Sequence, residues 1–223
     1  MVLDPQLVWN GLVVGSIIAV SALGLTLIFG ILNFINIAYG DYMAAGAYVA
    51  WAVNAQVGLP IGVAIVAGVL FMSVGSVVLD KLVFQHFRTR SPITLLIVSI
   101  GVAFFIRNLL RAIWGPSGHF YDLPLEASPS FVGVRFSIEQ VAIMVTSLLL
   151  LLGVYVMLRR TRVGIAMRAA SDDRMLSRIR GVDTEKLVLY VWLIGGGIAG
   201  LGGIMLGLDA QIRPNMGFTA LIA

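Results

Sequence analysis

Two stretches without any charged residue, each too long for one membrane crossing, limit the folds open to this chain. The first lies between Asp4 and Asp41, and its 36 residues would form a helix about 54 Å long. The hydrocarbon core of a bilayer is only about 30 Å thick. A single straight helix therefore does not fit, and we place a break at Gly30-Ile31-Leu32-Asn33. The first predicted span is 8–30.

The second uncharged stretch, residues 42–79, contains Gly58-Leu59-Pro60, where proline disfavours helical geometry in the residue before it. A break there leaves a broken second segment at about 32–57 and a full span at 60–79. The remaining spans are predicted at about 92–112, 138–158 and 187–207. The composition, 59% hydrophobic and 12% charged, excludes a water-soluble fold of this length. The prediction is an all-α transmembrane bundle of about six crossings, forming a single domain over residues 1–223.

Basic residues are concentrated in two loops separated by two predicted crossings. The segments 159–186 and 80–91 hold eleven of the fifteen Lys and Arg residues. Because cytoplasmic loops collect Lys and Arg, both are predicted to be cytoplasmic, and the N-terminus is predicted to be extracytoplasmic. The outer loop at about 113–137 holds Pro116, Pro124 and Pro129 together with Asp122 and Glu126. It serves either as a receptor for an extracellular partner or as a plain connection.

Polar side chains follow the first break. Asn33, Asn36, Tyr39 and Asp41 fall within or beside the membrane, where such groups cost free energy unless they pair or face water. A broken helix that lines a cavity would remove this cost, which makes these four residues candidates for a substrate path. The alternative places them at the inner headgroup boundary, where polarity costs little.

The loop 159–186 combines its arginines with apolar and acidic residues, which predicts two short amphipathic helices. Ser171 is expected to cap a helix that begins at Asp172, and Gly181 is expected to end it. Asp183 is expected to cap the following span. The loop then offers a docking element for a partner; the alternative is a basic surface lying on anionic lipid.

Small residues at helical spacing predict close packing between helices. The pattern occurs at Gly11-xxx-Gly15, Gly196-xxx-Gly200 and Gly203-xxx-Gly207. No Cys is present and the two histidines, His86 and His119, are far apart, so a metal site is not expected.

The sequence resembles the permease subunits of prokaryotic high-affinity branched-chain amino-acid ABC importers. Asn36-Ile37-Ala38-Tyr39-Gly40-Asp41, then Met43 and Gly46-Ala47-Tyr48, are similar to the family's Asn-Phe-Ala-His-Gly-Asp/Glu run and the helix after it. Ile37 and Tyr39 depart from the usual Phe and His, and tyrosine does not titrate near neutral pH. The run Arg162–Ala169 and Gly181-Val182 are similar to the family's cytoplasmic loop.

The resemblance implies that this loop docks on an ATPase. The residues expected to couple the two subunits are Gly164, Arg168, Ala169, Asp172, Asp173 and Arg174. The chain has no phosphate-binding loop and no catalytic constellation, so ATP is expected on partner subunits, with no cofactor and no enzymatic activity in this chain. The implied partners are ATPase subunits, a second permease subunit and an extracytoplasmic binding protein.

The resemblance therefore predicts a subunit of the prokaryotic cell membrane that imports branched-chain or related small amino acids, with urea or short amides as alternative substrates. An ATP-independent secondary transporter or channel, with Asp41 carrying a proton or cation, and a purely structural membrane subunit are the other interpretations. Family members continue beyond Asn215–Ala223 through further helices, so this chain is expected to be a fragment or a naturally short paralogue.

Overall fold

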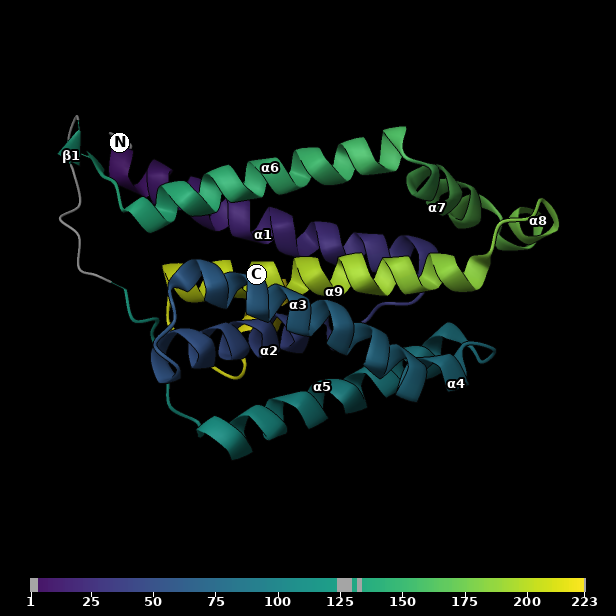
Figure 1. Cartoon of the computed structure of the whole chain (residues 1–223), viewed down its shortest axis with the longest axis horizontal. Helices are drawn as coiled ribbons and strands as arrows, with labels where there is room; N and C mark the ends of the chain where they lie inside the picture. The colour runs from purple at the N-terminus through teal and green to yellow at the C-terminus, as the bar shows by residue number, and fades with distance from the viewer. Residues whose placement is uncertain (1–3, 124–129, 132–133, 223) are drawn as a thin grey trace.

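The computed structural model describes residues 4–123, 130–131 and 134–222, which form a bundle of long helices lying roughly side by side (Figure 1). Two single π-helical turns, η1 and η2, continue α2 and α3. The elements in chain order are α1 (Pro5–Leu32), α2 (Tyr39–Trp51), η1 (Ala52–Gln56), α3 (Ile61–Leu79), η2 (Asp80–Phe84), α4 (Gln85–Phe87), α5 (Pro92–Trp114), β1 (Ser130–Phe131), β2 (Val134–Arg135), α6 (Ile138–Arg160), α7 (Arg162–Asp172), α8 (Arg174–Ile179), α9 (Thr184–Asp209) and α10 (Met216–Ile222). Apart from the short antiparallel pair β1–β2, the described elements are helical, which confirms the predicted fold class.

Five helices in the described residues are long and apolar enough to cross a bilayer: α1, α3 continued to Phe87, α5, α6 and α9. Five of the six predicted crossings are therefore continuous helices. The remaining passage, from Asn33 to Gln56, is irregular as far as Ala38 and then helical through α2 and η1. This is the broken second segment that the uncharged stretches predict.

Both predicted breaks occur where the sequence places them. Helix α1 ends at Leu32 because Asn33 adopts a left-handed conformation, with φ 56° and ψ 33°, and its N–H donates to the Phe29 carbonyl. Asparagine is one of the few residues that tolerate this geometry. The second break turns at Gly58, with φ 77°, and Pro60 precedes α3.

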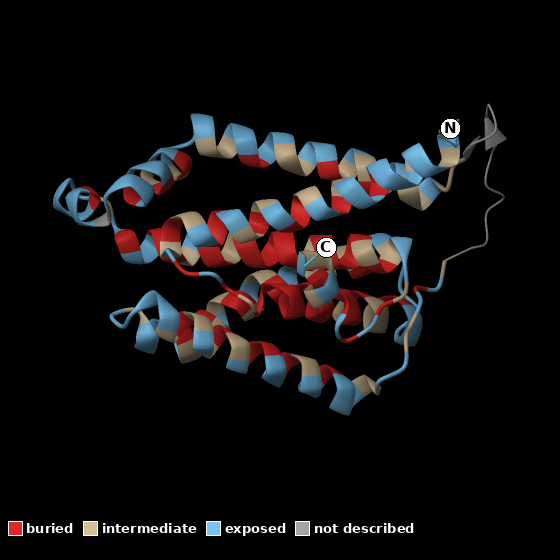
Figure 2. Cartoon of the chain, turned by 180° about the vertical axis from the view of Figure 1, so that it is seen from behind, coloured by how far each residue is buried: buried red, intermediate tan, exposed pale blue. Residues whose placement is uncertain are grey.

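Helix α9 forms the centre of the bundle, in contact with α1, α2 and α3. The buried residues gather on α9 and α2, whereas α5 and α6 are exposed along much of their length (Figure 2). Glycines permit the close crossings. A Cβ at Gly196 would lie 2.5 Å from the Met72 carbonyl oxygen of α3, and one at Gly203 would lie 1.9 Å from the Met43 carbonyl oxygen of α2.

The packing prediction therefore holds for the glycines of α9 and is wrong for those of α1. A Cβ added at Gly11 or at Gly15 would meet no neighbouring atom within 4 Å, because both residues lie on a face of α1 that no other described element covers. Spacing alone does not distinguish a packed glycine from an exposed one.

The two basic loops lie at the same end of the bundle, as the parity of the crossings predicts. Helices α4, α7 and α8 lie together at one end of Figure 1, and the start of α1 and strand β1 lie at the other. At that second end, the Trp9 indole N–H donates to Gln140 Oε1 over 2.7 Å, which joins the start of α1 to α6. Pro124, Glu126 and Pro129 of the predicted outer loop fall outside the described residues.

Candidate functional site

Two backbone N–H groups of the irregular segment before α2 donate to side chains. Asn36 Oδ1 accepts from the Ala38 N–H over 3.1 Å, and Ser99 Oγ of α5 accepts from the Ile37 N–H over 3.2 Å. Non-helical backbone at membrane depth requires such partners, because lipid supplies none. Asn36 and Ser99 therefore explain how the chain can break inside an apolar bundle.

A bidentate ion pair joins the start of α2 to α5. Arg107 Nε donates to Asp41 Oδ1 over 2.9 Å, and Nη2 donates to Oδ2 over 3.0 Å. The Asp41 side chain is 0% exposed and that of Arg107 is 14% exposed. The guanidinium also lies 4.9 Å from the centre of the Phe218 ring of α10. Two opposite charges thus neutralise each other where neither would be stable alone.

The pairing of Arg107 with Asp41 was not predicted from the sequence, although the sequence contains a pattern that indicates this pair. Arg107 and Arg111 are the only charged residues within the predicted span 92–112, and Asp41 is the only acid within the predicted broken segment 32–57. Because an unpaired charge at membrane depth is costly, pairing acids and bases across spans would have identified the contact.

Helix α10 covers this ion pair because its backbone lies directly against the backbone of α2. A Cβ at Gly217 would lie 1.9 Å from the Gly40 carbonyl oxygen, so α10 and α2 touch backbone to backbone. This contact brings Phe218, the next residue, over Arg107. The start of α2, the middle of α5 and α10 consequently form one unit.

Three of the four path candidates lie around the start of α2, but they face different neighbours. Asp41 faces α5, whereas the Tyr39 hydroxyl faces α1, where a Cβ at Gly24 would lie 1.9 Å from it. Asn36 and Tyr39 are 0% exposed. Among the described residues, the buried Tyr39 hydroxyl has no hydrogen-bond partner, whereas the Tyr42 hydroxyl interacts with the Asn36 side chain. Asn33 stands apart, exposed at the end of α1.

The opposite end of α2 is covered by the segment that follows α5. Asn54 Oδ1 accepts from the Asp122 N–H over 2.8 Å, and the Tyr121 hydroxyl donates to the Ala47 carbonyl over 3.2 Å. Burial raises the pKa of Tyr121, so the hydroxyl keeps its proton and its role as donor. The ring centroids of Trp51 and His119 lie 4.0 Å apart. These contacts fix residues 119–122 across this end of the bundle.

The predicted docking loop forms the two short helices α7 and α8. Met167 and Ala170 of α7 are buried, whereas four of the predicted coupling residues are exposed: Arg168, Ala169, Asp172 and Asp173. The fifth, Arg174, begins α8, and its side chain lies outside the described structure. The loop thus anchors one face on the bundle and presents a charged face outward.

Gly164, the sixth predicted coupling residue, is buried and has a packing role. A Cβ there would lie 2.2 Å from the Met157 carbonyl oxygen, because the chain reverses sharply between α6 and α7. Thr161 caps α7 at this turn by accepting from the Gly164 N–H over 3.1 Å. Only glycine allows α7 to approach the end of α6 this closely.

The capping prediction for α8 is wrong by two residues. Ser171 and Asp172 belong to the end of α7, and Asp173 caps α8 by accepting from the Leu176 N–H over 2.9 Å. Asp173 takes this role because its backbone is extended, as an N-cap requires. The Ser171 hydroxyl instead donates to the Gly30 carbonyl, which fixes α7 to the end of α1.

The predictions that Gly181 ends the second short helix and that Asp183 caps the following span are confirmed. Gly181 follows α8 with φ 87°, and Asp183 caps α9 by accepting from the N–H groups of Glu185 and Lys186. These hydrogen bonds, above all that of Lys186, together with the Lys186 ammonium, lower the pKa of Asp183.

Comparison with known proteins identifies the family. Residues 7–223 match the family model described as branched-chain amino acid transport system / permease component. The chain is 28% identical to the high-affinity branched-chain amino acid transport system permease protein BraD of Pseudomonas aeruginosa, over 95% of this chain and 73% of the relative. It is 26% identical to LivH of Escherichia coli, over 96% of this chain and 74% of the relative.

A probable branched-chain amino acid transport permease protein LivH of Methanocaldococcus jannaschii is 29% identical, over 100% of this chain and 71% of the relative. No solved structure matches the chain. The broken second segment, the buried Asp41–Arg107 pair and the two loop helices are therefore features of a multi-pass membrane protein that belongs to the permease-component family of branched-chain amino acid transport systems.

Proposed function

We propose that the chain is the membrane-spanning subunit of an ATP-driven importer of branched-chain or related small amino acids. An extracytoplasmic binding protein delivers the substrate, and two permease subunits enclose the path. ATP is bound by separate cytoplasmic subunits. The observation that carries this proposal is the α7–α8 loop, which projects from the basic end of the bundle with its charged residues exposed.

The proposed orientation follows from the position of the charges. The α4 turn and the α7–α8 loop share one end of the bundle, and this end carries eleven of the fifteen basic residues. By the positive-inside rule, that end is cytoplasmic and the N-terminus is extracytoplasmic. An ATPase then has direct access to Arg168, Asp172 and Asp173.

The proposed path runs along the break before α2. Asn36, Tyr39 and Asp41 supply buried polar groups there, whereas Asn33 lies exposed at the start of the break. The buried groups include an atom, the Tyr39 hydroxyl oxygen, with no partner in the described part of this chain. Such an atom is available to a polar substrate when α2 separates from its neighbours. The bidentate pair with Arg107 occupies both Asp41 oxygens, which favours this interpretation over a carrier in which Asp41 binds a cation.

Docking is tested with the double substitution Arg168→Glu and Asp172→Lys in the complex purified with its ATPase subunits. Both residues are exposed, so the bundle should fold normally while stimulated ATP hydrolysis falls. An unchanged rate of hydrolysis would count against the docking role.

Substrate class is tested by uptake into proteoliposomes of labelled leucine, urea and short amides. The proposal expects leucine uptake that depends on ATP and on the binding protein. Uptake that continues without nucleotide but collapses with the ion gradient would instead establish a secondary transporter.

A further inference from the structure

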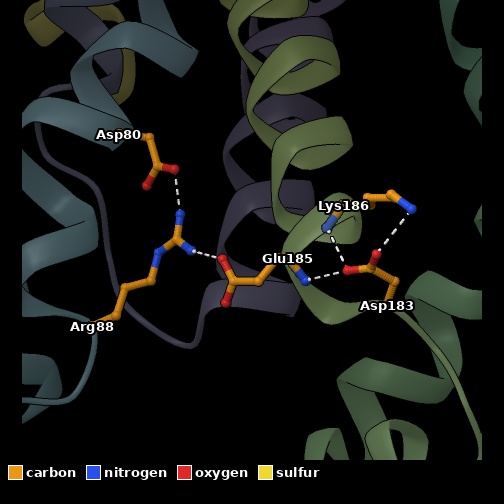
Figure 3. Close-up of polar contacts among 5 residues, drawn as sticks. All are labelled: Asp80, Arg88, Asp183, Glu185 and Lys186. Carbon is orange, nitrogen blue, oxygen red and sulfur yellow. Dashed lines mark hydrogen bonds and ion pairs between the residues drawn. The ribbon is translucent and has the colours of Figure 1, made fainter.

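Arg88, in the turn between α4 and α5, bridges two acidic residues from different parts of the chain (Figure 3). Its Nη2 donates to Asp80 Oδ2 of η2, and its Nη1 donates to Glu185 Oε2 of α9 over 3.1 Å. The rigid fork of a guanidinium suits this double contact, which a lysine ammonium does not reproduce. The bridge joins the two basic loops at the proposed cytoplasmic end.

The two arms of this bridge differ strongly in burial. The Asp80 side chain is 6% exposed and that of Arg88 is 16% exposed, whereas that of Glu185 is 62% exposed. Separating Arg88 from Asp80 leaves a buried carboxylate without its counter-ion, which is costly. Separating Arg88 from Glu185 only returns an exposed carboxylate to water. The Glu185 arm is therefore the one that opens readily.

Glu185 lies directly after the α7–α8 loop. Helix α8 ends at Ile179, Gly181 turns the chain, and Asp183 caps the first turn of α9, which contains Glu185. The Asp183 cap accepts from the Glu185 N–H over 3.2 Å, so Glu185 moves with the cap (Figure 3). A displacement of α8 thus reaches Glu185 through a few residues.

On its other side, the bridge lies directly before the first turn of α5. Ser91 caps α5 three residues after Arg88. Helix α5 packs mainly against α2. An apolar groove of about 690 Å³ separates α5 from α3. It is lined by residues of α3 and α5, among them Leu70, Val74, Phe105 and Leu109.

The α5 residues that line the groove all belong to its outer half, so that half packs loosely against α3. The inner half is held by the buried Leu95, by Ser99, which accepts from the Ile37 N–H, and by the turn that Arg88 fixes to Asp80 and Glu185.

We infer that Arg88 is a positioning residue that couples the α7–α8 loop to α5, with the Glu185 arm as the contact that breaks and re-forms during transport. This inference rests on the proposed function. Movement of α8 shifts the first turn of α9, which releases Arg88 from Glu185 while Asp80 keeps hold of it. The inner end of α5 is then less restrained, and its movement reaches the Arg107 contact to Asp41 in the middle of the same helix.

The test uses Glu185→Gln in the complete complex, with its ATPase subunits and binding protein, in proteoliposomes. The variant keeps the side-chain size and the buried Asp80 contact but removes the charged arm. We expect the number of substrate molecules moved per ATP to fall about two- to five-fold, the range that corresponds to a partly exposed ion pair. Glu139→Gln is the matched control, because Glu139 lies in the first turn of α6 at the opposite end.

A second measurement needs neither partners nor substrate. In lipid nanodiscs, Glu185→Gln should raise amide hydrogen exchange over residues 85–91 about two- to five-fold, and Arg88→Lys should act in the same direction. Glu139→Gln should leave exchange in this segment unchanged.

The outcomes separate this inference from the proposed function. Unchanged exchange over 85–91 in Glu185→Gln overturns the bridge itself. Raised exchange with an unchanged transport ratio overturns the coupling role and leaves the proposed function standing. A wild-type complex that moves no substrate with ATP overturns the proposed function and this role together.

Discussion

The buried ion pair between Asp41 and Arg107 predicts a large loss of stability when either partner is removed alone. Replacing Arg107 with Met keeps most of the aliphatic packing but leaves the Asp41 carboxylate, which is 0% exposed, without its two N–H donors at 2.9 and 3.0 Å. Breaking a buried pair in this way costs about 3–5 kcal/mol. Loss of the contact with the Phe218 ring, at 4.9 Å, adds roughly 0.5–2 kcal/mol.

A double-mutant cycle separates the ion pair from other effects of the substitutions. Asp41→Asn alone should also destabilise the bundle, because Arg107 then loses its counter-ion. The double variant Asp41→Asn/Arg107→Met removes both charges and should be more stable than Arg107→Met alone, with a coupling energy of about 0.5–3 kcal/mol.

The assay is reversible unfolding by denaturing detergent in mixed micelles, followed by circular dichroism. Arg111→Ala serves as the control, since Arg111 lies one turn away on the same helix with its side chain exposed, and it should change stability by less than about 0.5 kcal/mol. If Arg107→Met costs no more than Arg111→Ala, or if the two single effects simply add, the account of this pair as a buried mutual neutralisation is refuted.

Two further predictions concern the packing and capping of α9. Gly203→Ala should destabilise the bundle by about 1–3 kcal/mol, because the added Cβ would lie 1.9 Å from the Met43 carbonyl oxygen. Gly75→Ala should leave the stability unchanged, because its Cβ would meet no described atom within 4 Å. Equal stability of the two variants in the same detergent titration would contradict the α2–α9 crossing. The pKa of Asp183 is lowered by Lys186, so its contribution to capping is present above the unfolded pKa of about 3.9 and is lost as the pH falls through the lower folded value. Protection of the first amides of α9 against hydrogen exchange should therefore decrease in acid, and Asp183→Asn, which caps without titrating, should abolish that pH step; a step that persists in the variant would assign it to another group.

Local signals in the sequence predicted much of the fold because they act over a few residues. Asn33 ends α1 and Gly58 with Pro60 separates η1 from α3, since each needs or imposes a specific backbone geometry. The Asp183 cap and the Gly181 turn were predictable for the same reason. Ser171 failed as a cap because three consecutive residues can all cap a helix, and propensity alone does not choose among them.

Contacts between distant segments were not predictable in the same way. The pairing of Asp41 with Arg107 depends on α5 lying beside α2, and the Arg88 bridge depends on α4 lying beside the start of α9. The distribution of Lys and Arg predicted that the two basic loops lie at the same end of the bundle, but it did not predict which side chains meet there. Gly164 was assigned to docking from the family resemblance, whereas its burial against α6 is a matter of packing.

The side of the membrane on which the α7–α8 loop lies tests the central claim most directly. Because the chain contains no cysteine, Asp172→Cys introduces a single thiol at an exposed position of α7. The account predicts that a membrane-impermeant maleimide labels this thiol in inverted vesicles that lack the ATPase subunits and leaves it unlabelled in intact cells. Labelling in intact cells would place the loop outside, beyond the reach of any cytoplasmic ATPase, and would contradict the account.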